Sequence, residues 1–211
     1  MLLQTGHRLD ERGFIAANDG NLSARWQTGR FLVTRSGSMK GRLEPFDLLV
    51  VDESGMQVAE PQHPGVPAEY RVSSEWKMHL ALYRARPDIH AVVHAHPPFA
   101  TAWAASRKEL PEPVLPEVTV ILREVPLVPF AVPGTQEFAD TVAKVAREKN
   151  TTVLLLANHG VVAVGADPIA ALDQLERVEH AAKILLLSKI IDGPVKLTES
   201  EAAALAAAYP R

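Results

Sequence analysis

Two histidines separated by one residue, His94 and His96, have the spacing that points most directly to chemistry in this chain. They close an apolar run, residues 89–95, that Pro97 and Pro98 end, and this pattern is typical of a buried strand that reaches the edge of a sheet. Because side chains alternate along a strand, both imidazoles are expected on the same face. Two neutral imidazoles on one face suit a small divalent cation. Alone, the pattern also describes two hydrogen-bonded histidines at a strand end.

A third histidine, His159, follows a second apolar run, residues 153–157, and Gly160 after it allows another group to approach closely. A lone histidine before glycine is more often a turn residue, but beside the first two it becomes the expected third ligand. Three imidazoles leave one position of a zinc ion open, which is the arrangement of a catalytic site. The chain contains no cysteine, so a thiolate site is excluded.

Glu75 follows Ser73 and Ser74 where the pattern predicts the start of a helix. One interpretation is that its carboxylate only compensates the helix dipole. The other is that it acts as a base or metal ligand beside an anion bound at the helix N-terminus. The loops at 18–21 and 36–37 are also rich in small donors of the kind that phosphate sites use, although each alone is an ordinary turn.

Short strands and helices alternate along the chain and must position these residues. Strands are predicted at 22–26, 31–34, 48–51, 56–58, 89–95, 118–122, 153–157 and 161–164. Helices are predicted at 1–14, from 73 to Pro87, and at 99–107, 135–149, 168–191 and from 198 onward. This order predicts a single α/β domain over residues 1–211, with a mixed or largely antiparallel sheet covered on both faces. His79 is expected to be a packed core residue. Charged residues of 173–189, Glu176 and Glu179 among them, are expected to face solvent or a neighbouring subunit.

The composition indicates an ordinary globular protein, with 211 residues, 47% hydrophobic residues and a net charge of −3. This charge gives no electrostatic reason to expect a nucleic acid or an anionic membrane as a partner. The first residues lack both the basic and the apolar segment of a signal peptide, and no apolar run is long enough to cross a membrane. A cytoplasmic protein is therefore expected.

Five motifs together resemble the class II aldolase/adducin family in order and spacing: G-N-L-S-A-R at 20–25, T-R-S-G at 34–37, S-S-E-W at 73–76 with His79, H-A-H-P at 94–97 and N-H-G at 158–160. The resemblance implies a three-layer α/β/α domain with a mostly antiparallel sheet, assembled as a C4 homotetramer with active sites between subunits. It also implies zinc, or another divalent transition metal, held by His94, His96, His159 and Glu75, with Glu75 as acid/base. Substrate phosphate would lie among Asn18, Asn21, Ser36, Gly37, Ser73 and Ser74.

The reaction that the resemblance implies is cleavage of a ketose 1-phosphate, such as L-fuculose 1-phosphate, into dihydroxyacetone phosphate and an aldehyde such as lactaldehyde. A metal ion would stabilise the enediolate that this cleavage leaves. The sequence departs from the family at two positions. Glu117 stands in the segment where the aldolases place a proton-donating tyrosine, and Asn18 stands where threonine is usual.

Three alternatives remain. An L-ribulose-5-phosphate 4-epimerase would use the same metal chemistry, but the sequence has no match to the Asp and Tyr positions associated with epimerases. A sugar-phosphate dehydratase is a further possibility within the family. A non-catalytic interaction module, as in adducin heads, need not retain three histidines and Glu75, which this chain has.

Overall fold

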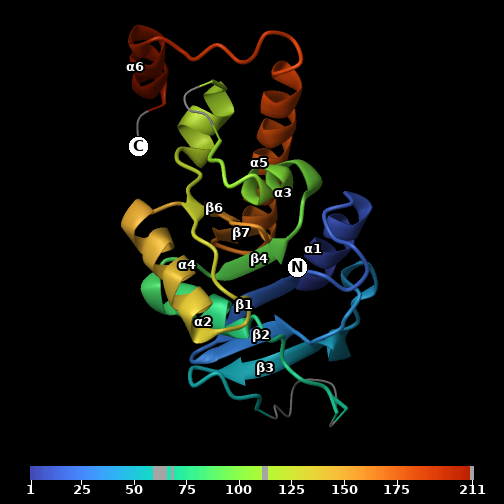
Figure 1. The fold of residues 1–211 in the computed structure, drawn as a ribbon. Coiled ribbons are helices and arrows are strands. Elements are labelled where there is room, and N and C mark those ends of the chain that lie inside the picture. Colours follow the sequence, from blue (N-terminus) through green and yellow to red (C-terminus); the bar gives the residue numbers. More distant parts are fainter. Residues whose placement is uncertain (59–65, 68, 111–113, 210–211) are drawn as a thin grey trace.

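The computed structural model describes residues 1–58, 66–67, 69–110 and 114–209. Its middle layer is a seven-stranded sheet in the order β3-β2-β1-β4-β7-β6-β5 (Figure 1). Neighbouring strands are antiparallel except for the parallel pair β5 and β6, so the predicted mostly antiparallel sheet is confirmed. The strands are β1 (Asn21–Gln27), β2 (Arg30–Thr34), β3 (Leu48–Asp52), β4 (Ala91–Ala95), β5 (Leu127–Val128), β6 (Val153–Leu156) and β7 (Gly160–Gly165).

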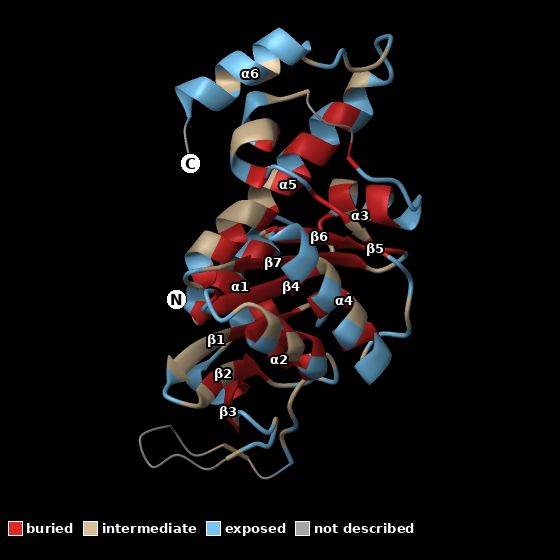
Figure 2. Cartoon of the chain, turned by 90° about the vertical axis from the view of Figure 1, so that its left-hand side faces the viewer, coloured by how far each residue is buried: buried red, intermediate tan, exposed pale blue. Residues whose placement is uncertain are grey.

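Helices cover both faces of the sheet and complete a three-layer α/β/α domain. The helices are α1 (Leu2–Glu11), α2 (Trp76–Ala85), α3 (Pro98–Ala105), α4 (Gln136–Lys149), α5 (Pro168–Ser188) and α6 (Glu199–Ala208). Helices α2 and α4 lie on one face, and α1, α3 and α5 lie on the other (Figure 1). Figure 2 shows the buried residues concentrated on the sheet and on the inner sides of these helices, whereas α6 buries none.

The two faces have separate hydrophobic cores because side chains alternate along each strand. On β4, Val92 packs under α2 and α4, while Val93 packs under α1, α3 and α5. His94 therefore points to the same face as Val92, toward α2. Strand β4 lies in the middle of the sheet and carries His94, and His96 follows directly after its end.

Several helix ends follow from local sequence. Thr135 accepts a hydrogen bond from the amide of Phe138 at the start of α4, and Asn150 ends that helix in the left-handed conformation with φ 46°. Asp167 caps α5 in the same way. Thr198 and Glu201 form the predicted capping box of α6.

Two predicted strands are wrong. Val118–Leu122 is a short π-helix, because Val118 and Leu122 on one side pack into the core beside α5 although the β-branched run favours a strand. Residues 56–58 contribute only one bridge, between Val51 and Gln57, after a turn that the Asp52 carboxylate closes by accepting from Ser54 and Met56. The predicted helix from Pro168 is confirmed as α5, and it ends at Ser188, three residues before the predicted end.

The helix start predicted at Ser73 also differs, since α2 begins at Trp76 after a turn. Ser73 Oγ accepts only from the amide of Glu75, at 3.3 Å. Glu179, expected to face solvent or a neighbouring subunit, is buried instead. Its carboxylate accepts from the amides of Phe99 and Ala100, at 3.0 and 2.7 Å, because the first-turn amides of α3 have no partner within the helix.

No helix in the described part of the chain combines the length and the apolar character needed to cross a membrane.

Candidate functional site

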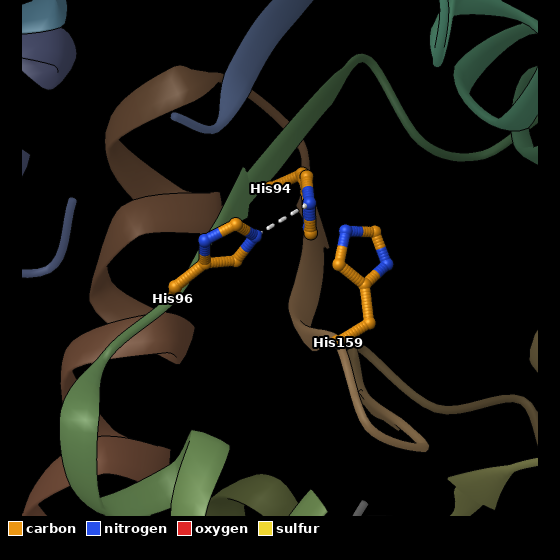
Figure 3. A group of neighbouring side chains, drawn as sticks. All are labelled: His94, His96 and His159. Atoms are coloured by element: carbon orange, nitrogen blue, oxygen red, sulfur yellow. Dashed lines mark hydrogen bonds between the residues drawn. The ribbon is translucent and has the colours of Figure 1, made fainter. Parts of the chain in front are cut away.

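Three imidazoles converge at the end of β4 (Figure 3). His94 is fully buried on the strand, where it pairs with Asn21 of β1 and Val162 of β7. His96 lies just past the strand end, and His159 lies in the tight turn between β6 and β7. The structure brings one potential ligand atom from each within 4.8 Å of the others. The chain thus gathers three neutral-nitrogen ligands from two separate segments.

Hydrogen bonding fixes which nitrogen of His94 faces the cluster. Its Nδ1 lies 2.9 Å from the carbonyl of Val161, and a carbonyl can only accept, so Nδ1 carries the proton. Nε2 therefore presents its lone pair, 3.3 Å from His96 Nε2. Burial lowers the pKa of His94 to about 3, and burial together with the nearby His94 lowers the pKa of His159 to about 4. Both rings are neutral near pH 7, as metal ligands must be.

Glu75 directs its carboxylate at the histidines from the turn before α2. Oε1 lies 3.4 Å from His159 Nε2 and Oε2 lies 3.4 Å from His94 Nε2. Oε2 accepts from Asn21 Nδ2 at 2.7 Å, while Oε1 is buried without a hydrogen-bond partner in the described residues. A buried carboxylate oxygen without a donor is expensive unless a cation meets it. Three imidazole nitrogens and this oxygen fit a divalent transition metal.

The conformation of the turn that carries His159 accounts for the residues on either side of it, Asn158 and Gly160. Asn158 adopts the left-handed conformation, with φ 56°, and its side chain accepts from Arg107 Nε at 2.7 Å. At Gly160, a Cβ atom would overlap the His96 ring and lie 2.8 Å from the carbonyl of Ala95. Glycine is therefore required where the two histidine-bearing segments touch.

The polar loops lie side by side near the same edge. The amide of Ser36 donates to the carbonyl of Arg71 at 2.8 Å, and Arg35 bridges Val72, so the turn at 36–37 lies next to the segment that enters Ser73. Gly37 has φ 73°, which glycine adopts without strain. These loops offer exposed or half-buried donors, the kind of surface on which an oxyanion binds.

The family to which this arrangement belongs follows from comparison with known proteins. The profile of the class II aldolase and adducin N-terminal domain matches residues 1–186. The chain belongs to the class II aldolase and adducin family. The resemblance read from the motifs is thereby confirmed.

Relatives within the class II aldolase and adducin family carry names of two different reactions. A 3-oxo-tetronate 4-phosphate decarboxylase of Haemophilus influenzae is 32% identical over 188 residues, covering 87% of this chain and 84% of the relative. An L-fuculose phosphate aldolase of Methanococcus vannielii is 33% identical over 178 residues, covering 84% and 90%. A solved L-fuculose 1-phosphate aldolase superposes with a TM-score of 0.85 at 32% identity, covering 99% of this chain and 93% of that chain. The fold is therefore that of the class II aldolases, and the names of these relatives differ in substrate.

Glu117, in the segment where class II aldolases place a tyrosine, is not brought to the histidines. It is exposed and lines a cavity of about 730 Å³ between the π-helix and α5. Among the described residues, none of the three histidines lines this cavity. A role for Glu117 at the histidines of its own chain therefore has no support in its position.

Two of the residues expected to bind phosphate, Asn18 and Asn21, make hydrogen bonds within the protein that the sequence did not reveal. Asn18 is exposed, but its carbonyl accepts from Lys40 Nζ at 2.6 Å, and the same ammonium donates to the carbonyl of Ser38 at 2.8 Å. Asn21 is buried, with its side chain held between Glu75 and His79.

Sequence reasoning missed Lys40, which ties the loop at 18–21 to the turn after Gly37. The side chain is buried, and burial lowers the pKa of Lys40 to about 8. A single lysine shortly after a serine-glycine turn has no distinguishing pattern, so no signal in the sequence could have found it.

Proposed function

We propose that this protein is a metal-dependent, cytoplasmic lyase that releases dihydroxyacetone phosphate from a phosphorylated sugar or sugar acid. The observation that carries the proposal is the Glu75 Oε1 atom, which is buried, lies 3.4 Å from His159 Nε2 and has no hydrogen-bond partner among the described residues. His94, His96, His159 and Glu75 would hold one zinc ion or a similar divalent ion. When bound, that ion would supply Lewis-acid stabilisation of the negative charge that develops on the substrate oxygens.

The first candidate reaction is the aldol cleavage of a ketose 1-phosphate such as L-fuculose 1-phosphate. A base removes the proton of the C4 hydroxyl, the C3–C4 bond breaks, and lactaldehyde leaves. The remaining three-carbon enediolate takes a proton at carbon to become dihydroxyacetone phosphate. In this chain, Glu75 would hold or move that proton, since Asn21 anchors Oε2 while Oε1 has no hydrogen-bond partner in the described part of the chain.

The second candidate is decarboxylation of 3-oxo-tetronate 4-phosphate, which the similarity to the Haemophilus influenzae decarboxylase favours. Loss of carbon dioxide from C1 leaves electrons on C2 beside the C3 ketone, and protonation gives the same dihydroxyacetone phosphate. This reaction has no aldehyde leaving group, so it has no need of a separate acid at that position. The absence of tyrosine from residues 115–117 is consistent with it.

Substrate phosphate would bind among Asn18, Asn21, Ser36, Gly37, Ser73 and Ser74. Proximity of the two serine-bearing loops supports this, because phosphate bound there would supply binding energy away from the reacting carbon. We further propose a homotetramer with active sites between subunits. In such an assembly, Glu117 of one copy would act as an acid in the site of another, since it lines a cavity that none of the three histidines of its own chain lines. Light scattering on a size-exclusion column would show a mass of four chains.

The test offers both substrates to the purified protein and measures dihydroxyacetone phosphate, with aldehyde and carbon dioxide as the distinguishing products. Turnover with either substrate that disappears on chelation supports the proposal, and the co-product decides between aldolase and decarboxylase. Formation of an epimer or a dehydrated sugar instead would replace it with one of the other family reactions. No product and no bound metal would point to an interaction module.

A further inference from the structure

A chain of buried polar groups connects Tyr83 on α2 with the Glu75 carboxylate. The Tyr83 hydroxyl lies 2.9 Å from Ser23 Oγ, and Ser23 Oγ lies 2.7 Å from His79 Nδ1. On the other side of the ring, His79 Nε2 lies 2.6 Å from Asn21 Oδ1. Asn21 Nδ2 completes the chain to Glu75 Oε2 at 2.7 Å. Five residues from β1 and from α2 with its preceding turn thus form one continuous series of short contacts.

The direction of every hydrogen bond follows from the charge at one end. An ionised carboxylate can only accept, so Asn21 must present its amide group to Glu75 and its carbonyl oxygen to His79. His79 must then donate from Nε2, which leaves Nδ1 as an acceptor. Ser23 donates to that nitrogen and accepts from the Tyr83 hydroxyl. A reversal at any step would place two acceptors or two donors face to face.

Burial fixes these hydrogen-bond directions. Ser23 and His79 are completely buried, and Tyr83 and Asn21 are exposed by only 2% and 4%. In such surroundings an unpaired donor or acceptor is costly, and a fully satisfied network holds its members in one arrangement. Burial also lowers the pKa of His79 to about 3, so the ring is neutral and carries a single nitrogen-bound proton near pH 7.

We propose that Asn21, His79, Ser23 and Tyr83 are positioning residues that hold the Glu75 carboxylate toward the three histidines, with the single proton of His79 fixed on Nε2. The functional part of this inference rests on the proposed role of Glu75. The network anchors Oε2, and no described residue hydrogen-bonds Oε1, so the network fixes the position of the oxygen that would move a proton. It also explains why His79, four residues after Glu75, is not a member of the group of His94, His96 and His159, since Ser23 and Asn21 occupy its two ring nitrogens.

The proton position can be measured without any substrate. Nitrogen-15 spectra of the histidine side chains in the full protein distinguish a protonated ring nitrogen from a bare one, and comparison with His79→Gln assigns the His79 signals. We expect a proton on Nε2 and a bare Nδ1 at neutral pH. In Glu75→Gln, where the fixed charge is gone, we expect a mixture of the two tautomers. A proton on Nδ1 of the wild-type ring, or on both nitrogens, would overturn the proposal.

The positioning role is tested by comparing Ser23→Ala with Met78→Leu. Met78 is buried next to His79 on α2 and belongs to none of the polar contacts, so it controls for a change in packing. We expect Ser23→Ala to lower kcat about tenfold, with KM and bound metal unchanged, because the base is displaced and not removed. Met78→Leu should keep its kcat. Equal losses in both variants, or a normal kcat in Ser23→Ala, would contradict the positioning role.

The two measurements separate this inference from the proposed function. If the wild-type protein turns over none of the offered substrates, the proposed function fails, while the His79 spectra still decide whether the network has the stated direction.

Discussion

Replacing Glu75 with glutamine separates its two interpretations, because glutamine keeps the shape of the side chain but cannot carry a proton. The carboxylate accepts one hydrogen bond, from Asn21 at 2.7 Å, and the amide oxygen of glutamine can still accept it. The bond loses its charge assistance, and the buried site loses an uncompensated charge. These effects oppose each other, so the free energy of unfolding should change by no more than about 1 kcal/mol.

Turnover should behave very differently. General acid–base catalysis contributes roughly 10²–10⁴ in rate, so kcat of Glu75→Gln should fall by that factor. Bound metal should fall as well, since a charged ligand has become a neutral one. The matched control is Glu137→Gln, because Glu137 is an exposed glutamate in the first turn of α4. Its loss should cost about 0.3–1 kcal/mol through the helix dipole and leave turnover unchanged.

The assay combines steady-state release of dihydroxyacetone phosphate with urea unfolding of the same preparations. Near-normal kcat in Glu75→Gln, with a stability loss like that of Glu137→Gln, would show that Glu75 acts only on the helix dipole. In that case Glu75 would have no acid–base role, and the hydrogen-bond network that holds it would have no role in catalysis.

Three further predictions address the surroundings of the site. In Gly160→Ala the new methyl group would displace the His96 ring, so metal affinity should fall about 10–100-fold. Competition with a chelating dye measures this affinity, and an unchanged value would exclude His96 as a ligand. The pKa of Lys40 is lowered to about 8 from 10.5, so between pH 8 and pH 10.5 the unfolded chain binds a proton that the folded chain lacks. The free energy of unfolding, relative to that of Lys40→Met, should therefore rise with pH across this window by at most about 3 kcal/mol. Urea unfolding at several pH values measures that difference, and a flat difference would show that the ammonium is not held in a desolvated site. Glu117→Gln should lower kcat about 10²–10⁴-fold without loss of stability if another copy supplies this residue as an acid, whereas normal kcat would remove it from the mechanism.

The sequence alone could predict the features that depend on local periodicity. The apolar run predicted the buried strand that carries His94, and the proline pair marked its end to within two residues, although His96 lies past that end and not on the strand. The helix caps at Thr135 and Thr198 were also correct, because capping needs only residues that are close in the chain. The family resemblance supplied the three-layer arrangement of the fold.

Features that depend on contacts between distant segments could not be predicted. Val118–Leu122 has the composition of a strand, but no local pattern shows whether a neighbouring strand is free to pair with it. Asn21 and Glu75 are separated by 54 positions, so their hydrogen bond appears only when β1 meets the turn before α2. The burial of Glu179 has the same origin, because it depends on where α3 begins relative to α5.

We propose above that His94, His96 and His159 hold one metal ion that the reaction requires. The most direct test is to strip the protein with a chelator, titrate zinc back, and follow release of dihydroxyacetone phosphate. We predict that turnover is lost on stripping and returns in proportion to added zinc until one ion is bound per chain, and that His159→Ala does not recover. Full turnover of the metal-free protein, or recovery of His159→Ala to the wild-type rate, would contradict the claim.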